Sequence, residues 1–383
     1  MGPVSEFAGG RVVIIGGGVV GLSVAYHLVA RGHRDVTVVE RNRLGSGTTS
    51  KGTGGIRQQF SSEINILLSR RAVDWFSRSA DLVDFRQHGY LFLLDRPEHM
   101  DIFETNAAKQ RAADVPVSLL DPTAISDVMP HVDTDGLVGA SYCPTDGSAS
   151  PKDLVAVFSS RAREHGASLR EGTAVTAIER DAHGAVRAVR TDVGSIEADV
   201  VVNAAGPWAA EVGRLLDISL PITPRRRQAF EIAPLSWLVP SLPFTIDLAS
   251  GAYVHPGNDA GVIGGNDRDT AAGFDAAMDW GLTRPLMEAL TRRIPAMAEA
   301  EIRRGWAGLR DMTPDDHAIV GPVEAVPGFW VAAGFSGHGF MHSPVVGELI
   351  AEWLIDGVPG MDLGALGTER FEGGTAVPET AVF

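Results

Sequence analysis

Three glycines and one acidic residue near the N-terminus have the types and spacing needed to hold a phosphorylated cofactor. Gly16, Gly18 and Gly21 follow a short apolar run, and Glu40 stands about 20 residues further on. Glycine allows a tight turn, a close approach of the backbone to a pyrophosphate, and close packing of a helix on a strand. A carboxylate at the next strand end accepts hydrogen bonds from ribose hydroxyls and repels a 2′-phosphate. The pattern predicts a dinucleotide other than NADP.

The elements that must position these residues can be read from the same stretch. Val12–Ile15 and Val36–Val39 are apolar runs typical of buried parallel strands, and the helical pattern between them stops at Gly32. A glycine motif in this strand, turn, helix, strand context favours nucleotide binding over an ordinary glycine-rich turn. The N–H groups and the positive dipole end of the helix would then face the phosphates.

A second glycine-rich segment near the C-terminus repeats this design. The apolar run Phe329–Ala333 enters Gly334–Phe340, and we expect a helix to begin at Ser343-Pro344 and to end before Gly357. The start of that helix is another place that stabilises an anion. A central apolar strand also breaks at small residues, at 203–207, which indicates close approach to a ligand.

Bulk composition limits the classes of partner. The chain has 383 residues and a formal net charge of −15, which disfavours nucleic acid and anionic membranes as partners. Its one cysteine, Cys143, excludes an intrachain disulfide, and we expect a cytoplasmic protein. No run is typical of a membrane span. Met1–Ala8 reads as a leader and is left out of the fold prediction.

The segment between the motifs differs in type. From Ile222 to Val262 short alternating runs are separated by prolines, which predicts an antiparallel sheet, and Thr283–Arg293 predicts a helix. We therefore predict an α/β (α+β) chain: a Rossmann-type dinucleotide-binding domain with a second, mainly antiparallel-sheet domain.

Four segments also carry a resemblance to a known family. They read GGGVVGLSVAYHLVARG (16–32), VVNAAGPWA (201–209), WAGLRDMTPDDHAIVG (306–321) and AAGFSGHGFMHSP (332–344). In this order they resemble the FAD-dependent D-amino-acid-oxidase (DAO) family, which includes dimethylglycine dehydrogenase. GGIRQQF (54–60) and GFSGHGF (334–340) are most similar to the sarcosine oxidase beta subunit, glycine oxidase and the catalytic subunit of dye-linked L-proline dehydrogenase.

The resemblance implies a two-domain fold of the glutathione-reductase-2/DAO type. A discontinuous FAD-binding domain would comprise residues 9–82, 145–222 and 305–372, and the substrate-binding domain 83–144 and 223–304. Residues 373–383 would form a loose tail.

The resemblance also implies which residues hold the cofactor. The expected FAD-binding residues are Gly16, Gly18, Val19, Val20, Gly21, Glu40, Arg41, Thr48, Thr49, Ser50, Lys51, Gly54, Gly55, Val175, Ala205, Gly206, Gly337, His338, Gly339, Phe340 and Met341. Gly308 stands where monomeric sarcosine oxidase attaches its flavin to a cysteine, and residues 41–55 contain no histidine. We therefore expect non-covalent FAD and no metal site.

Four residues are the expected substrate-side groups. Arg310 matches an arginine that binds a carboxylate, Tyr253 a tyrosine over the flavin, and Arg57 an arginine near the flavin. His255 follows Tyr253 by two residues and so shares its strand face. Met341 replaces a lysine that binds the substrate carboxylate in sarcosine oxidases, which leaves Arg310 as the main anion-binding group.

The expected reaction is oxidation of a C–N bond in an amino acid or a secondary or N-methyl amine, by hydride transfer to flavin N5, giving an imine. The partners would be this small molecule and either O2 or an electron carrier, and the chain could form homo- or hetero-oligomers. One competing hypothesis is an FAD-dependent 2-hydroxy-acid dehydrogenase, which would need a base such as His255 or His342. A second is a non-catalytic flavoprotein subunit or assembly factor, and a third is an NAD enzyme.

Overall fold

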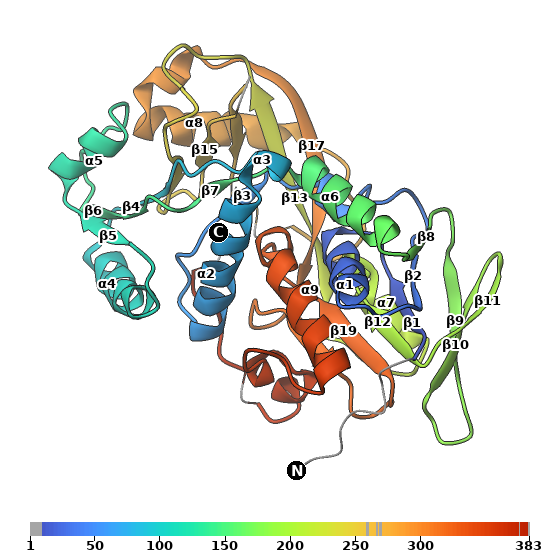
Figure 1. The fold of residues 1–383 in the computed structure, drawn as a ribbon. Helices are drawn as coiled ribbons and strands as arrows, with labels where there is room; N and C mark the ends of the chain where they lie inside the picture. Colours follow the sequence, from blue (N-terminus) through green and yellow to red (C-terminus); the bar gives the residue numbers. More distant parts are fainter. Residues whose placement is uncertain (1–9, 258–259, 266, 268–269, 375, 382–383) are drawn as a thin grey trace. The chain divides into compact units, whose positions relative to one another are not determined.

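The computed structural model describes residues 10–257, 260–265, 267, 270–374 and 376–381 (Figure 1). The expected leader, Met1–Ala8, lies outside them. The chain forms two compact units. Unit 1 comprises residues 1–52, 150–225 and 309–379, and unit 2 comprises residues 53–149, 226–308 and 380–383. No helix of the described residues has the length and apolar character to cross a membrane.

Unit 1 is built on a six-stranded sheet. Its order is β18 (Ile319–Pro322), β19 (Phe329–Ala333), β12 (Val200–Asn203), β1 (Val12–Ile15), β2 (Val36–Val39) and β8 (Ser168–Arg170). All neighbours are parallel except β18, which is antiparallel to β19. The carboxyl ends of the parallel strands therefore meet at one edge, where ligands bind in open α/β sheets. This confirms the predicted Rossmann-type architecture.

Helices cover both faces of this sheet. On one face α1 (Val19–Ala30) lies between α6 (Pro151–Glu164) and α9 (Gly339–Asp356) (Figure 1). On the other face Val13 and Ile15 pack in a core cluster that includes residues of α7 (Ala209–Arg214). A separate antiparallel sheet contains β9 (Val175–Arg180), β10 (Val186–Thr191) and β11 (Gly194–Glu197).

The start of α9 differs from the prediction. The helix begins at Gly339, not at Ser343, and Pro344 lies inside it. Pro344 has no N–H to donate to the carbonyl of Phe340, four residues earlier. The hydroxyl of Ser343 donates to that carbonyl instead, at 2.9 Å, so the proline does not end the helix. As expected, the helix ends at Gly357, with φ of 81°.

Unit 2 contains a mainly antiparallel sheet, as predicted. Its order is β17 (Ile302–Met312), β13 (Thr223–Ile232), β16 (Val262–Gly264), β15 (Tyr253–His255), β14 (Phe244–Asp247), β4 (Tyr90–Leu94), β6 (Gly139–Cys143) and β5 (Ser118–Leu120). The strands from β13 to β5 pair with antiparallel neighbours, except that β14 and β4 are parallel. The boundary between the units falls within β17, after Gly308.

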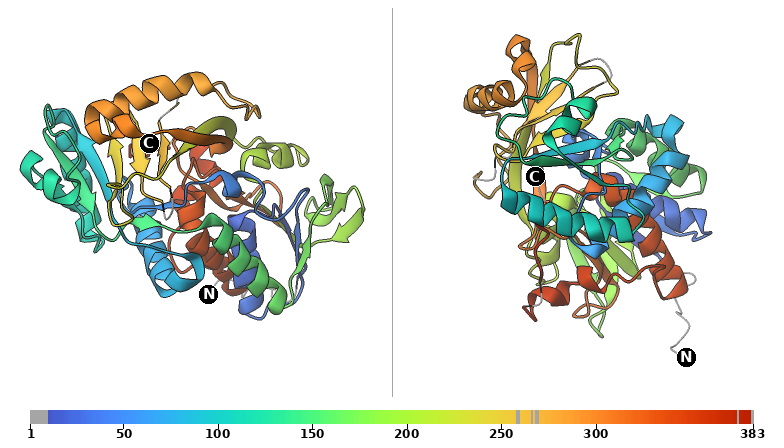
Figure 2. Two further views of the ribbon diagram at one scale, coloured as in Figure 1. Left: turned by 90° about the horizontal axis from the view of Figure 1, so that it is seen from above. Right: turned by 90° about the vertical axis from the view of Figure 1, so that its left-hand side faces the viewer.

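The two faces of this sheet pack against different helices. Leu91 and Leu93 of β4 belong to a cluster with residues of α5 (Pro122–Val128) and α8 (Thr283–Arg293). Phe92, between them, packs on the opposite face with residues of α4 (Pro97–Ala112). Figure 2 shows α8 running across its face of the sheet. Unit 2 also contains two further α-helices, α2 (Glu63–Arg78) and α3 (Ala80–Val83), and the short strand pair β3 (Gly55–Ile56) and β7 (Gly147–Ser148).

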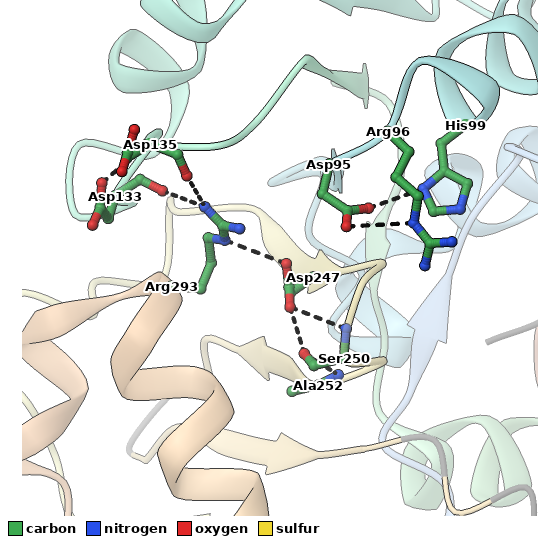
Figure 3. A network of polar contacts seen from close by, with 9 residues as sticks. All are labelled: Asp95, Arg96, His99, Asp133, Asp135, Asp247, Ser250, Ala252 and Arg293. Carbon is green, nitrogen blue, oxygen red and sulfur yellow. Dashed lines mark hydrogen bonds and ion pairs between the residues drawn. The ribbon is translucent and has the colours of Figure 1, made fainter.

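Arg293 ties the last turn of α8 to the sheet (Figure 3). Its Nε donates to Asp247 at the end of β14, at 3.3 Å. Its Nη1 donates to the carbonyl oxygens of Asp133 and Asp135, at 2.7 and 3.1 Å. The second oxygen of Asp247 accepts the hydroxyl of Ser250. One guanidinium therefore joins a helix, a strand end and a loop of unit 2.

The units differ from the expected domains in several places. Residues 53–82, 145–149 and 305–308, expected in the FAD-binding domain, fall in unit 2, and residues 223–225 fall in unit 1. Within unit 2, α4 side chains bind part of the first segment: Gln110 donates to the carbonyl of Phe60 and Lys109 to that of Ser61. The expected loose tail was wrong for residues 379–381. The N–H of Glu379 donates to Asp315 within unit 1, and that of Thr380 donates to Ser61 within unit 2.

Candidate functional site

The first glycine turn has steric requirements of two kinds. Gly16 has φ of 113°, and a Cβ there would lie 2.4 Å from the carbonyl oxygen of Ala204. A Cβ at Gly21 would lie 2.0 Å from the carbonyl oxygen of Gly16, so helix α1 could not approach the strand. Both glycines are therefore required by the fold itself.

Gly18 is different, because the protein around it does not require a glycine. Its φ of −77° suits any residue, and a Cβ would meet only Thr49 Oγ1 within 4 Å, at 3.3 Å. It caps α1, whose first residues, Val19 and Val20, have N–H groups without partners inside the helix. The N–H of Val19 donates to Thr49 Oγ1 at 3.3 Å. Open space beside a helix N-terminus fits a pyrophosphate.

Glu40 lies directly after β2, as the ribose-binding acid should. Its two carboxylate oxygens accept the N–H groups of Gly17, at 2.9 Å, and Asn42, at 2.8 Å. Its carbonyl accepts the N–H of Thr173, which leads into β9 and its first residue, Val175. The carboxylate and the start of β9 therefore belong to one region of unit 1.

The polar loop after Glu40 is held at both ends. The guanidinium of Arg41 stacks on the ring of Trp208, 4.1 Å from its centroid. The hydroxyl of Thr48 donates to the carbonyl of Leu309, at 3.0 Å. Ser50 donates within the loop, and the neighbouring Lys51 is exposed. The loop thus connects the start of α1 with the end of β17.

The break after β12 is stabilised by a buried amide. Asn203 donates from Nδ2 to the carbonyl of Ala209, at 2.8 Å, and its Oδ1 accepts the N–H of Ala205, at 3.3 Å. Gly206 has φ of 52°, and a Cβ there would meet nothing within 4 Å. The turn thus places small residues and open space at the carboxyl edge of the sheet.

The loop between β19 and α9 is fixed by the end of β17. One carboxylate oxygen of Asp311 accepts the N–H groups of Gly334, at 2.7 Å, and Phe335, at 3.1 Å. The N–H of Ser336 donates to the carbonyl of Asp311. The N–H of Thr313 donates to the hydroxyl of Ser336, at 3.1 Å. Backbone and side-chain bonds together hold the residues that precede α9.

Arg310 lies against this same loop. Gly337 has φ of 98°, and a Cβ there would be 2.8 Å from Nε of Arg310. His338 follows, and the first turn of α9 contains Gly339, Phe340 and Met341. Met341 is 6% exposed, so its thioether belongs to the core. The guanidinium of Arg310 and the positive end of α9 both favour an anion nearby.

Tyr253 and His255 lie on one face of β15 in unit 2. Val254, between them, points into the hydrophobic core on the other face. The ring of Phe244 contacts both, with centroid distances of 5.0 Å to Tyr253 and 4.8 Å to His255. Burial, aided by His88, lowers the pKa of His255 to about 3. The imidazole is therefore neutral, and its buried Nδ1 has no hydrogen-bond partner among the described residues.

The remaining predicted residues of unit 2 have structural contacts. Gly54 accepts the N–H of Ala149 through its carbonyl. A Cβ at Gly55 would be 1.9 Å from the hydroxyl of Tyr90. Arg57 is 6% exposed, and its guanidinium donates to the carbonyls of Gln59 and Ala381. These hydrogen bonds give Arg57 a structural role, because they fix the backbone at Gln59 and Ala381.

Sequence reasoning missed three residues that organise the site: Asp311, Asn203 and Trp208. The alternation of a strand through Arg310 places Asp311 on the opposite face, where a carboxylate needs donors, and this signal was available. The contact of Trp208 with Arg41 joins segments far apart in sequence, which no local pattern indicates. The described residues include no group of three or more His, Cys, Asp or Glu that could hold a metal.

Comparisons with known proteins agree with this geometry. The sequence matches the protein-family model described as "FAD dependent oxidoreductase" (DAO) over residues 11–353. The crystal structure of L-proline dehydrogenase from P. horikoshii is 34% identical, covers 96% of this chain and 98% of that chain, and has a TM-score of 0.91. Glycine oxidase of Geobacillus kaustophilus (strain HTA426) is 29% identical over 378 residues, with 96% of this chain and 98% of the relative covered.

Some relatives are much longer. Mitochondrial dimethylglycine dehydrogenase of Rattus norvegicus is 29% identical over 387 residues, with 94% of this chain but only 45% of the relative covered. The chain thus spans less than half the length of this relative. The open space beside Gly18, the carboxylate of Glu40 and the N-termini of α1 and α9 fit an FAD molecule. The chain belongs to the DAO family of FAD-dependent oxidoreductases.

Proposed function

We propose that this protein oxidises the C–N bond of an amino acid or a secondary or N-methyl amine to an imine, with non-covalent FAD as the oxidant. The observation that carries the proposal is the placement of Arg310. Its guanidinium lies against Gly337 in the loop that leads into α9, within the unit that carries the dinucleotide motif. When bound, FAD would supply the acceptor for the hydride, which carries the two electrons away from the carbon beside the nitrogen.

Arg310 is the group we propose to bind the substrate carboxylate. The side chain is half-buried, and a guanidinium can bind both oxygens of a carboxylate at once. The residue that replaces the lysine of sarcosine oxidases, Met341, is buried and uncharged. The similarity to an L-proline dehydrogenase and a glycine oxidase supports an amino-acid substrate.

On unit 2, we propose a substrate-side role for Tyr253 and His255. A neutral His255 adds no positive charge that would disfavour an amine. Its unpartnered Nδ1 can accept an N–H group. A catalytic role for Arg57 has less support, because its guanidinium is occupied by backbone carbonyls.

The 2-hydroxy-acid hypothesis has weaker support. Oxidation of an alcohol needs a base that removes the hydroxyl proton. Burial lowers the pKa of His255 to about 3, which makes it a weak base. The other candidate, His342, is 1% exposed inside α9.

Several finer features of the proposal concern partners and location. The electrons would pass to O2 or to a carrier protein, and the protein would work in the cytoplasm, as its single cysteine favours. A homo- or hetero-oligomer remains part of the proposal. Acid precipitation tests the cofactor linkage: all flavin should appear in the supernatant, and flavin retained on the protein would contradict non-covalent binding.

An anaerobic flavin-reduction screen tests the proposed reaction. The holoenzyme is mixed with proline, glycine, N-methyl amino acids, D-amino acids and hydroxy acids, and the loss of oxidised-flavin absorbance is followed. We expect bleaching by at least one amine and by no hydroxy acid. Bleaching by hydroxy acids alone would favour the hydroxy-acid dehydrogenase, and a flavin that no compound reduces would favour a non-catalytic subunit.

A further inference from the structure

The loop Gly334–His338 lies at the ligand-binding edge of unit 1. It follows β19, which is parallel to β12, and β12 is parallel to β1. The carboxyl ends of β1 and β19 therefore share one edge of the sheet, and the glycine turn at Gly16 follows β1 at that edge. The loop also opens into α9, whose first N–H groups have no partners inside the helix.

A buried carboxylate controls the conformation of this loop. Asp311, at 7% exposure, accepts the N–H groups of Gly334 and Phe335 through one oxygen. Its own carbonyl accepts the N–H of Ser336, which has a left-handed φ of 50°. Three successive N–H groups of the loop are thus bound to a single residue of β17.

The charge of this group is costly for the fold. Burial raises the pKa of Asp311, while the N–H donors of Phe335 and Gly334 and the nearby Arg310 lower it. A neutral acceptor such as an amide oxygen could bind the same N–H groups without placing a carboxylate in a low-dielectric environment. The presence of an acid therefore calls for a role beyond shape.

We propose that Asp311 is a positioning residue for the flavin, which fixes the loop that leads into α9 and opposes flavin reduction through its negative charge. Reduction adds negative charge to a flavin, and protein groups near it change its potential electrostatically. A carboxylate bound to the adjacent backbone disfavours that added charge. This inference depends on FAD binding, which the family membership gives, and is independent of the substrate.

The Asp311→Asn holoenzyme tests both parts. Its Oδ1 can still accept the loop N–H groups, so FAD should remain bound with a dissociation constant close to that of the wild type. The flavin midpoint potential, measured by spectroelectrochemistry at mildly alkaline pH, should shift to a more positive value. Asp311→Ala leaves two buried N–H groups unsatisfied and should raise the FAD dissociation constant at least about tenfold.

Asp199→Asn is the matched control. Asp199 precedes β12 at the opposite edge of the same sheet, where it binds Arg11. The variant removes one negative charge from the same unit and should leave the potential at the wild-type value. A potential of Asp311→Asn equal to that of this control would overturn the charge role. Wild-type FAD affinity in Asp311→Ala would overturn the positioning role.

Asp311→Glu keeps the test decisive if the asparagine variant does not fold. It retains the charge but moves the carboxylate by one methylene. The potential should stay close to the wild-type value while FAD is released faster. Unchanged FAD release, or a positive shift of the potential, would contradict the proposal.

Discussion

At the scale of single residues, Arg310 provides the specificity that we propose for an anionic substrate. Arg310→Lys keeps the charge but loses the planar fork, and we expect the apparent affinity for a carboxylate substrate to fall about tenfold. Arg310→Ala removes the cation and should cost about a hundredfold. Both are measured by titrating flavin reduction anaerobically.

Arg304→Ala is the control for the Arg310 variants. Arg304 lies on the same strand, with a side chain 70% exposed and paired with Glu231. Its loss should leave substrate affinity unchanged. If Arg310→Ala had the same affinity as this control, the carboxylate assignment would be wrong.

Two buried histidines make stability depend on pH. Burial lowers the pKa of His255 to about 3 and that of His88 to about 4, both from 6.5. Because the folded pKa values lie below the unfolded ones, the stability is fully present above pH 6.5 and is lost as the pH falls towards 4 and 3. We expect the unfolding free energy contributed by these histidines to fall on acidification by about 1.4 kcal/mol per unit of pKa shift expressed, and the thermal midpoint to fall with it.

His255→Phe tests this pH dependence, because it removes one of the two titrating groups. The midpoint should fall less steeply with acid than in the wild type. The exposed His183→Asn variant is the control and should keep the wild-type slope. Burial also raises the pKa of Asp146 to about 6. The contribution of Asp146 to stability is therefore present at low pH and is lost as the pH rises, opposite to that of the histidines. A slope in His255→Phe as steep as in the control would contradict the account.

At the scale of elements, the glycine turn contains a glycine that the fold requires, Gly21, and one that we expect only the ligand to require, Gly18. Gly18→Ala should weaken FAD binding at least about tenfold and leave the apoprotein as stable as the wild type, since only Thr49 lies near the added methyl. Gly21→Ala should destabilise the apoprotein, because its Cβ would overlap the carbonyl of Gly16. FAD titration and chemical unfolding measure the two effects. Equal loss of apoprotein stability in both variants would contradict this separation.

The start of α9 depends on one side-chain bond. Ser343→Ala removes the hydroxyl that donates to the carbonyl of Phe340 and should cost about 1 kcal/mol of unfolding free energy. The control is Ser160→Ala in α6, where an exposed hydroxyl binds Glu164. Chemical denaturation should show a smaller loss for the control. Equal losses would mean that the bond does not sustain the helix across Pro344.

The strands and helices of unit 1 were predictable because their signals are local. Val12–Ile15 and Val36–Val39 appear in the structure as the expected strands. The start of α9 was mispredicted because the compensating bond from Ser343 runs backwards along the helix. A proline is common in the first turn of a helix, and the predicted start at Ser343-Pro344 was based on that preference.

The organisation of the site was less predictable than the elements. The glycine motif and Arg310 have sequence signals, but the bonds from Asp311 to Gly334 and Phe335 join positions more than 20 residues apart. The anchoring of Ala381 by Arg57 joins almost opposite ends of the chain. Contacts of this kind depend on tertiary packing, which a propensity pattern does not contain.

At the scale of the whole molecule, the chain combines a Rossmann-type unit with a mainly antiparallel unit. Its membership of the DAO family identifies FAD as the cofactor. The chain spans nearly all of the glycine oxidase and L-proline dehydrogenase relatives but less than half of dimethylglycine dehydrogenase. The proposed oxidation of a C–N bond by the bound FAD can be measured directly.

That measurement is the anaerobic reduction of the bound FAD by an amino-acid or amine substrate. The account predicts that the oxidised-flavin absorbance disappears on adding such a substrate, that an imine or its hydrolysis product forms in equal amount, and that Arg310→Ala needs far more substrate for the same bleaching. Reduction by hydroxy acids alone, or no reduction by any amine in the panel, would contradict it.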